Sequence, residues 1–381
     1  MDALTTPLPK DWEVKTFRDI STINQGLQIP ISQRLKAPTE HAKFYITIQA
    51  LNNRKEFEYI KTYNESVVCH KDDILMTRTG NTGMVITNIE GVFHNNFFKI
   101  NFDRTLINKD FLVYFLSLEQ TQKTILKKAG TSTIPDLNHN DFYSLLIPLP
   151  PLNEQIAIAN ILSDLDHYLY SLDALILKKE SVKKALSFEL LSQRKRLKGF
   201  NQAWQRVRLG DIAEIKRGVR ITKNELDVFG KYPVVSGGVG FLGYTNNFNR
   251  YENTITIAQY GTAGFVNWQN QKFWANDVCF CVYPNKDVIK NIFLYYFLKV
   301  NQNYLYEISN RNATPYSISK DKILDFEILL PPLNEQSAIA NILSGLDHEI
   351  ISLKNKKRQF ENIKKALNHD LMSAKIRVLK K

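Results

Sequence analysis

A 21-residue segment occurs twice in this 381-residue chain, and it constrains the fold more than any other feature. LPPLNEQIAIANILSDLDHYL occupies residues 149–169 and LPPLNEQSAIANILSGLDHEI occupies residues 330–350, with 17 of 21 positions identical. A chain with an internal repeat folds as repeated structural units. We therefore expect a duplicated architecture.

The repeat extends into the residues that precede each copy. WEVKTFRDISTINQGLQI at 12–29 matches WQRVRLGDIAEIKRGVRI at 204–221, and GNTGMV at 80–85 matches GTAGFV at 261–266. The offset falls from 192 to 181 residues, so the second copy has a net deletion between the first strand and the glycine turn. We define four parts along the chain: module A (1–150), helix A (151–200), module B (201–331) and helix B (332–381).

Apolar residues in both helices follow the alternating four- and three-residue spacing of a heptad repeat. We predict that the helices pair through Ile158, Leu162, Leu165, Leu169, Leu172, Ile339, Leu343, Leu346, Ile350 and Leu353. Proline suits the first turn of a helix, which fits the Pro-Pro pair before each one. Each helix is expected to span about 45 residues, or ~70 Å. Since such helices are not stable alone in water, an antiparallel coiled coil is expected, with the modules related by a pseudo-twofold axis.

Within the modules, alternating apolar and β-branched residues predict strands at 44–51, 72–80, 83–89, 97–102, 253–261 and 277–284. One apolar helix is expected in each module, near 110–128 and 291–306. The fold class is therefore α+β: two tandem mainly-β/α domains, each followed by a long helix.

The formal net charge is +12, and its distribution is uneven. Residues 178–198 contain eight Lys or Arg and two Glu, and residues 354–381 contain ten against one Glu and one Asp. The excess lies at the ends of the long helices, where it could neutralise phosphates of a nucleic acid or form subunit contacts.

Several features point to a cytoplasmic protein without a membrane anchor. The N-terminal residues lack a secretion signal, and no window holds the roughly 18 consecutive apolar residues that a span requires. The odd count of three cysteines favours a reducing compartment. Cys279 and Cys281 have no second metal-binding pair and are expected to be buried on one face of a strand. No metal or cofactor is predicted.

Two copies of PLPPLNEQ.AIANILS.LD, each following a W..V.....DI......G module, resemble the specificity (S) subunit of type I restriction–modification systems. The resemblance covers essentially the whole chain. It implies two target recognition domains, each reading one half of a split site in double-stranded DNA. It also implies that the helices set the gap between the half-sites and dock two methyltransferase (M) subunits. By the same resemblance, the complex of S and M subunits methylates adenine, and restriction (R) subunits that join this complex add ATP-dependent DNA cleavage.

The sequence itself contains no Asn/Asp-Pro-Pro-aromatic methyltransferase loop and no G-x-x-x-x-G-K-[ST] phosphate loop. We therefore expect a subunit without catalytic residues, not a fused methyltransferase or nuclease. Two alternatives stay open: an S-type subunit of a methylation-only complex, and a coiled-coil scaffold that binds proteins.

Base readers should be polar residues on loops that differ between the two modules. The module A candidates are Gln25, Gln28, Arg34, Arg78, Thr79, Asn81, Lys127, Lys128, Thr131 and Ser132. The module B candidates are Lys216, Arg217, Arg220, Lys223, Tyr244, Asn246, Gln259, Tyr260, Thr262, Asn310, Arg311 and Asn312.

Other singled-out residues have structural interpretations. Gly80, Gly83, Gly261 and Gly264 are expected at turns that need positive φ. GGVGFLG at 237–243 is expected to be a turn between strands. His167 and His348 recur at equivalent helix positions, where helix pairing or a subunit contact is favoured over metal binding.

Overall fold

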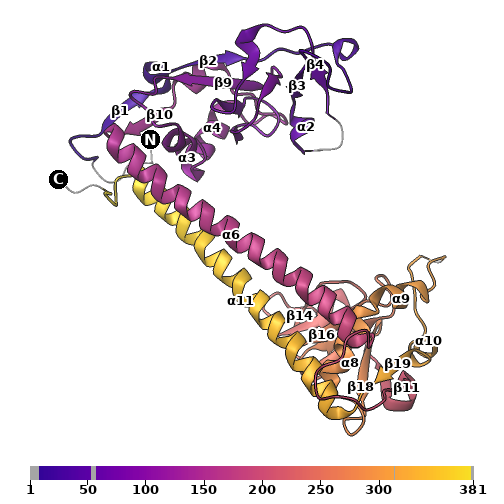
Figure 1. Ribbon diagram of the computed structural model, residues 1–381. Coiled ribbons are helices and arrows are strands. Elements are labelled where there is room, and N and C mark those ends of the chain that lie inside the picture. The colour runs from indigo at the N-terminus through magenta and orange to yellow at the C-terminus, as the bar shows by residue number, and fades with distance from the viewer. Residues whose placement is uncertain (1–7, 53–56, 313, 379–381) are drawn as a thin grey trace. The chain divides into compact units, whose positions relative to one another are not determined.

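The computed structural model describes residues 8–52, 57–312 and 314–378 (Figure 1). Interpretations that rest on residues 1–7, 313 and 379–381 lie outside the described residues. The chain forms two compact units: unit 1 holds residues 1–172 and 356–381, and unit 2 holds residues 173–355. Each unit therefore combines one module with the first part of one long helix and the last part of the other.

The described residues of unit 1 form three β-sheets. The first pairs β1 (Glu13–Thr16) with β10 (Leu146–Leu149) antiparallel, so the module's first and last strands lie together. The second is antiparallel, in the order β2 (Ser21–Gln25), β9 (Phe97–Phe102), β6 (Ile74–Thr77), β7 (Val85–Ile86). The third has the order β4 (Tyr59–Ile60), β3 (Lys43–Ile46), β8 (Gly91–Phe93), β5 (Val68–Cys69), with β3 parallel to β8.

The helices of unit 1 pack on these sheets around one large core. They are α1 (Phe17–Ile20), α2 (Ile48–Asn52), α3 (Lys109–Leu116), α4 (Glu119–Ala129), α5 (His139–Tyr143) and the 3₁₀ turns η1 (Ile31–Gln33) and η2 (Glu65–Val67). Phe17, Phe98, Phe111 and Phe142 are fully buried in this core. A smaller core around Tyr45 lies under the third sheet.

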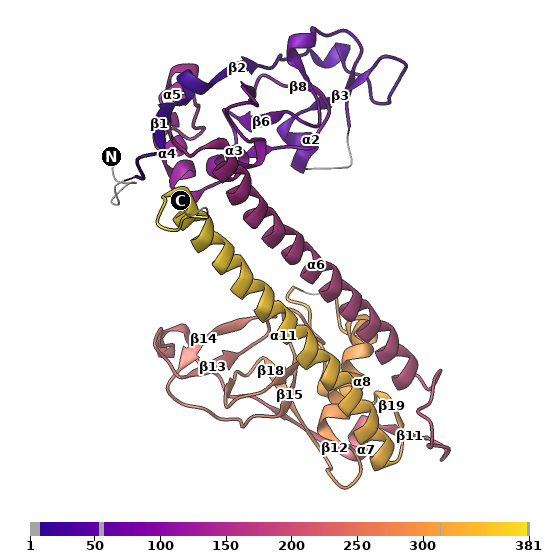
Figure 2. The same cartoon turned by 60° about the vertical axis from the view of Figure 1, so that its left-hand side comes forward.

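Unit 2 repeats the plan. β11 (Gln205–Arg208) pairs with β19 (Glu327–Leu330), and a four-stranded sheet has the order β12 (Ala213–Arg217), β18 (Cys279–Pro284), β15 (Thr254–Ala258), β16 (Val266–Gln269). A third sheet has the order β14 (Phe241–Thr245), β13 (Tyr232–Val235), β17 (Trp274–Ala275). Figure 2 shows β13 and β14 side by side. The helices are α7 (Leu209–Ile212), η3 (Lys223–Glu225), α8 (Asn291–Val300), α9 (Gln302–Glu307) and α10 (Lys320–Leu324).

The duplicated α+β architecture predicted from the sequence is confirmed, with corrections in detail. The prediction of one helix per module was wrong, because α3 and α4, like α8 and α9, are separate helices. The strand predicted at 44–51 ends at Ile46, and the short helix α2 follows. The third sheet differs most between the units, since β5, η2 and α2 of unit 1 have no counterpart among the described residues of unit 2.

The long helices are α6 (Leu152–Leu191) and α11 (Leu333–Met372), each of 40 residues, slightly shorter than the sequence suggested. Gln193 and Ala374 follow them with φ of 61° and 57°. A left-handed residue just past a helix releases the chain from the helical path, which explains the equivalent ends.

The two helices pair antiparallel within each unit, as predicted. In unit 1 Asp166 of α6 pairs with Lys364 of α11, and the Tyr168 and Phe360 rings lie 4.7 Å apart. In unit 2 Lys183 of α6 pairs with Asp347 of α11, and Lys179 lies 2.7 Å from Glu349. The pseudo-twofold relation between the modules stays a prediction.

The predicted pairing residues differ in burial. Ile158 and Leu162 lie fully buried in the core of unit 1 together with Leu371 and Met372. Ile339 and Leu343 lie in the core of unit 2 with Leu190, and α8 lies beside this part of α11 (Figure 2). Leu172 and Ile350 are buried, whereas Leu165, Leu169, Leu346 and Leu353 are half-buried. Their role in helix pairing stays a prediction.

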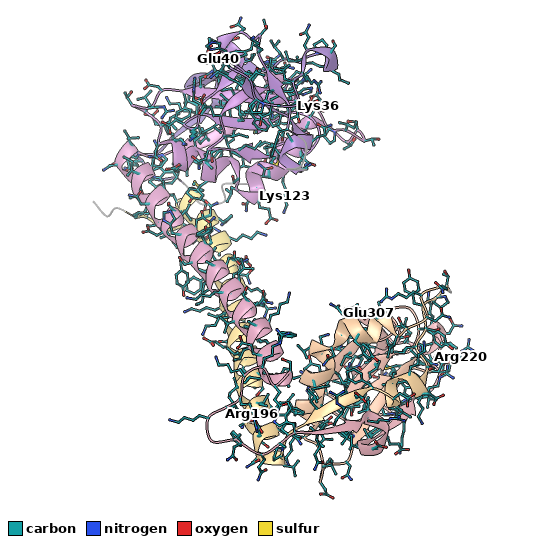
Figure 3. All side chains as sticks on the ribbon, turned by 45° about the vertical axis from the view of Figure 1, so that its right-hand side comes forward. Lys36, Glu40, Lys123, Arg196, Arg220 and Glu307 are labelled. Carbon is teal, nitrogen blue, oxygen red and sulfur yellow. The ribbon has the colours of Figure 1, made fainter. Side chains whose placement is uncertain are left out.

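The Asn-Glu-Gln residues of the repeated LPPLNEQ motif make equivalent contacts in the two units, which explains why the motif occurs twice. Glu154 is 2 % exposed and accepts hydrogen bonds from the Trp12 indole (3.1 Å) and from Arg377, which follows α11 (2.7 and 2.8 Å). Glu335 does the same with the Trp204 indole (3.0 Å) and Arg196, which follows α6 (3.1 and 2.6 Å; Figure 3). In each unit, a buried glutamate therefore fastens the start of one helix to the residue before the module's first strand and to the segment that follows the other helix.

The adjoining glutamine fixes the start of each helix to the module. The Gln155 amide donates to Leu106 O and Pro150 O and accepts from the Asn108 N–H. Gln336 makes the equivalent bonds with Val288 O, Pro331 O and the Lys290 N–H. Since buried polar groups need partners, this glutamine has little freedom to change.

Candidate nucleic-acid interface

The residues predicted to read DNA in module A fall in three segments, 25–34, 78–81 and 127–132, and the first two border the turn 94–96. The Gln25 amide donates to Asn95 O (3.2 Å), and the Arg78 backbone N–H donates to Asn96 O (2.7 Å). The Leu137 N–H donates to Arg78 O (2.8 Å), which brings in the segment after α4. The structure thus brings the loops that carry Gln25 and Arg78 next to each other and to the segment after α4.

The residues predicted in module B fall in four segments, 216–223, 244–246, 259–262 and 310–312, and the first and third border the turn 275–278. The Arg217 guanidinium donates to Asp277 O, and the Gln259 N–H donates to Val278 O (2.9 Å). The Ile318 N–H donates to Gln259 O, and Thr262 donates from both its N–H and its hydroxyl to Gly237 O. The loop before β14, which was predicted as a turn between strands, belongs to this cluster.

Positive-φ glycines support both clusters. Gly80 and Gly83 have φ of 64° and 92°, and Gly261 and Gly264 have 75° and 87°, as the sequence predicted. A side chain at Gly264 would lie 2.8 Å from Leu305 O. These glycines give each turn its conformation, and the absence of a contact from them to DNA stays a prediction.

Arg78 and Gln259 occupy equivalent positions and illustrate how the clusters differ. Arg78 pairs with Asp136 (2.7 Å), stacks 5.7 Å from the Phe98 ring, and has a side chain 18 % exposed. Its buried Nε has no hydrogen-bond partner among the described residues, and neither has the buried Oε1 of Gln259. The same place thus presents a donor in unit 1 and an acceptor in unit 2 that no described residue engages.

The other predicted residues divide by exposure. The exposed ones are Gln28, Asn81, Lys127, Thr131, Ser132, Lys216, Arg217, Arg220, Lys223, Tyr244, Asn246, Asn310, Arg311 and Asn312. The half-buried ones are Gln25, Arg34, Thr79, Lys128, Tyr260 and Thr262. Arg220, on the loop after β12, projects from the surface (Figure 3).

Some of these side chains are already engaged within the protein. Arg34 donates twice to Ile29 O and pairs with Glu58 (3.0 Å). Arg311 lies between the Tyr306 and Tyr316 rings, 5.1 and 5.2 Å from their centres. Such residues hold the loops in shape, and contact with DNA stays a prediction for every residue in the set.

The basic residues near the helix ends are engaged more than the sequence suggested. Lys364 pairs with Asp166 and contacts the Tyr114 ring, while Lys365 pairs with Glu119 (2.6 Å). In unit 2 Lys354 pairs with Glu180 (2.6 Å). Part of the charge therefore holds the helices to each other and to the module.

The remaining singled-out groups lie where packing explains them. Cys279 and Cys281 are buried in a small apolar cluster with Phe273, as predicted. The neighbouring thiol and burial raise the pKa of Cys279. His167 and His348 are exposed on their helices. No group of three or more metal-ligating side chains occurs in the described parts of the chain, and no described helix is long and apolar enough to cross a membrane.

Comparison with known proteins bears on this arrangement of paired modules and helices. The family described as type I restriction modification DNA specificity domain matches this chain twice, at residues 9–179 and 201–362. Each match spans one module and most of the long helix after it. The chain belongs to this family.

Similar specificity subunits align with this chain along its length. The type I restriction enzyme MjaVIII specificity subunit of Methanocaldococcus jannaschii is 25 % identical over 97 % of this chain and 94 % of its own length. The putative MjaX specificity subunit of the same organism is 27 % identical over 97 % and 95 %. The crystal structure of a type I system S subunit from M. genitalium shares the fold, with a TM-score of 0.67 at 20 % identity, covering 97 % of this chain and 98 % of that one.

Sequence reasoning on this specificity-domain chain missed several residues that the structure brings into the clusters. In unit 1, Gln49, His94 and Asn96 line a pocket beside the predicted loops, and in unit 2 Asn276 holds the loop after β12 by accepting from the Ile221 N–H. The matched segments FHNN and WAND at 93–96 and 274–277 carried a signal, because a polar turn recurs there with altered residues.

Proposed function

We propose that this chain is the non-catalytic DNA sequence-specificity subunit of a type I restriction–modification complex. Its two modules read the two halves of a split target in double-stranded DNA. The paired helices set the gap between the halves and dock methyltransferase subunits, two being expected from the duplication. The assembled complex then directs adenine methylation and, with restriction subunits, ATP-dependent cleavage.

One observation carries the proposal: equivalent loop clusters with different polar side chains stand on equivalent scaffolds. Shared glycines shape the loops, while Arg78 in one unit is replaced by Gln259 in the other. Arginine pairs with guanine and glutamine with adenine through bidentate hydrogen bonds, so such an exchange suits two readers with different targets.

Exposed apolar residues on the long helices support protein docking there. In unit 2 Leu177, Val182, Phe188 and Ile351 are 64, 45, 45 and 54 % exposed on α6 and α11. In unit 1 Tyr170 is 77 % exposed. Large apolar side chains exposed along a helix suit contact with another protein, and methyltransferase subunits are the partners the proposal assigns to them.

The first test is selection from a random duplex library with the full chain and a methyltransferase partner. The proposal predicts a split motif with two defined halves and a constant gap. Enrichment of no motif would favour the protein-binding scaffold instead. Adding the restriction subunits and ATP separates a restricting complex from a methylation-only one, because only the former cuts unmethylated DNA that carries the motif.

A further inference from the structure

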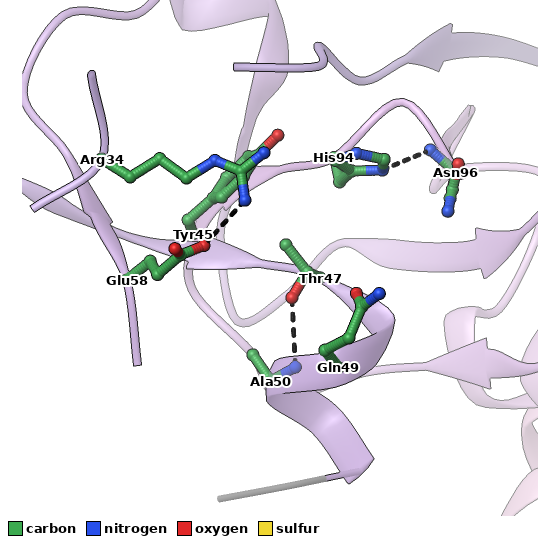
Figure 4. A pocket seen from close by; sticks show the side chains of 8 residues that line it. All are labelled: Arg34, Tyr45, Thr47, Gln49, Ala50, Glu58, His94 and Asn96. Atoms are coloured by element: carbon green, nitrogen blue, oxygen red, sulfur yellow. Dashed lines mark hydrogen bonds and ion pairs between the residues drawn. The ribbon is translucent and has the colours of Figure 1, made fainter. Parts of the chain in front are cut away.

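A pocket of about 350 Å³ opens in unit 1 beside the predicted reading loops (Figure 4). Its lining residues are Arg34, Tyr45, Thr47, Gln49, Ala50, Glu58, His94 and Asn96. Its lining comes from the residue after η1, from β3, from Thr47 and α2, from the residue before β4 and from the turn after β8, all within or next to the third sheet of the unit. This is the part of the fold that differs most between the two units, so it is where module-specific recognition should lie.

The walls of the pocket are fixed before any ligand arrives. Tyr45 is fully buried, and its hydroxyl donates to Leu27 O (2.8 Å) and accepts from the Ile29 N–H (3.0 Å). The Thr47 hydroxyl accepts from the Ala50 N–H, which holds the first turn of α2. Arg34 bonds to Ile29 O and to Glu58. A rigid frame of this kind lowers the entropy lost when a partner binds.

Two carboxamides face this frame without a partner. No hydrogen bond from a described residue engages the side-chain amide of Gln49 or of Asn96, and Figure 4 shows both at the pocket. The Asn96 N–H donates to His94 Nδ1 (3.1 Å), and Asn96 O accepts from the Arg78 N–H (2.7 Å). These bonds fix the backbone that carries the Asn96 side chain. Since Nδ1 of His94 accepts that bond, Nε2 carries the ring proton and adds a donor.

The charge of the pocket decides between two kinds of nucleic-acid contact. Arg34 and Glu58 are the charged residues of the lining, and they neutralise each other at 3.0 Å. A phosphate would meet a glutamate and no uncompensated cation. A base edge offers neutral donors and acceptors, which carboxamides match.

In the equivalent turn of unit 2, Asp277 takes the place of Asn96, and its carboxylate can only accept hydrogen bonds; Asn276 is equivalent to Asn95. Asn276 Oδ1 accepts from the Ile221 and Asp277 N–H groups, and its amide nitrogen donates to Ser236. That side chain is part of the scaffold and cannot also read a base. The free carboxamides are therefore a property of unit 1.

We propose that this pocket reads a base edge of the half-site recognised by module A, with the Gln49 and Asn96 carboxamides as specificity-determining groups. The inference rests on the proposed function. A carboxamide that both donates and accepts selects a base presenting one acceptor and one donor in the major groove, which is adenine. Arg34 and His94 act as positioning residues.

The test is selection from a random duplex library by the full chain in complex with its methyltransferase partner, comparing wild type with Gln49→Ala, Asn96→Ala and Gln49→Glu. Gln271→Ala is the matched control, since it removes an exposed carboxamide from unit 2. Both pocket alanine variants should lose the preference at one base pair of one half only. Affinity for the original site should fall roughly ten- to hundredfold.

Gln49→Glu keeps the shape but leaves only acceptors, so it should shift the preference toward bases that present a donor, such as cytosine. Pocket variants that keep the wild-type motif overturn the inference. So does a loss of affinity that is equal for all sequences, since that marks a contact to phosphate. A wild-type complex that selects no split motif refutes the proposed function itself, and the two failures are thereby distinguished.

Discussion

Removing Arg377 should destabilise unit 1 by leaving a buried carboxylate without its charge partner. In Arg377→Met, Glu154 keeps the Trp12 indole as a donor but loses two charge-assisted hydrogen bonds of 2.7 and 2.8 Å. The change also removes the Arg377–Asp11 pair at 3.0 Å. No other part of the module needs to move for these bonds to be lost.

The magnitude follows from the burial of the two partners. Breaking a buried ion pair costs about 3–5 kcal/mol when the remaining charge cannot reach water. Glu154 is 2 % exposed, but the Arg377 side chain is 28 % exposed, so water will replace part of the interaction. We expect a loss of about 2–3 kcal/mol. In a unit of this size that corresponds to a fall in melting temperature of roughly 4–12 °C.

Calorimetry of the full chain measures the shift, and hydrogen exchange of peptides from β1 and β10 locates it in unit 1. Lys375→Met is the control, because the Lys375 side chain is 44 % exposed and its charge lies 3.8 Å from Asp370. It should shift the melting temperature by under about 2 °C. Glu154→Gln combined with Arg377→Met should cost less than the sum of the two single changes. An Arg377→Met protein that melts like the control would refute the reasoning.

Three further outcomes follow from the structure. Gly345 lies within α11, and an added Cβ there would meet nothing within 4 Å, so Gly345→Ala should stabilise unit 2 by about 0.5–1 kcal/mol in urea unfolding. Gly218→Ala should instead destabilise unit 2, because its Cβ would lie 2.1 Å from Asn276 O. Equal effects of the two substitutions would contradict this. Glu119 accepts hydrogen bonds from Lys123 and Lys365, which lower its pKa to about 2. The stabilisation from these bonds should be complete above pH 4.5, the ordinary pKa of a glutamate, and should disappear as the pH falls toward 2. Lys365→Met should raise the pKa of Glu119 measured by NMR. The three cysteines are buried, and burial raises the pKa of Cys69 to about 12. An alkylating reagent at pH 8 should therefore label none of them in the native protein and all three after unfolding. Fast labelling of the native protein would contradict the packing.

The sequence predicted the architecture well because the repeat acts at long range. Identical residues at a constant offset establish two equivalent units, and the heptad spacing of residues such as Leu162 and Leu343 indicates which helix faces are apolar. Both signals can be read from the sequence without knowing which residues are in contact. The antiparallel pairing then follows from the need to cover two apolar faces.

Elements that depend on tertiary packing were not predictable in the same way. The break between α3 and α4 at Ser117 and Leu118 has no proline or glycine to mark it. The helix α2 follows a strand with a β-branched pattern, so local periodicity favoured a longer strand.

The candidate site was only partly predictable for a related reason. Differences between the modules pointed to the loops that the structure brings together, including position 78 and its equivalent 259. They could not show that Arg34 is held by Ile29 O and Glu58, or that Gln49 and Asn96 lie free beside it. Which polar side chain is engaged and which is open depends on distances that sequence alone does not contain.

The central claim is that two modules in one chain direct modification to a split DNA site. Single-molecule mapping of adenine methylation in the source cell, with and without the gene for this chain, tests it most directly. The account predicts that one split motif, with two defined halves and a constant gap, is methylated in the parent and unmethylated in the deletion strain. A methylation map that is unchanged by the deletion, or the loss of one continuous motif instead, would contradict it.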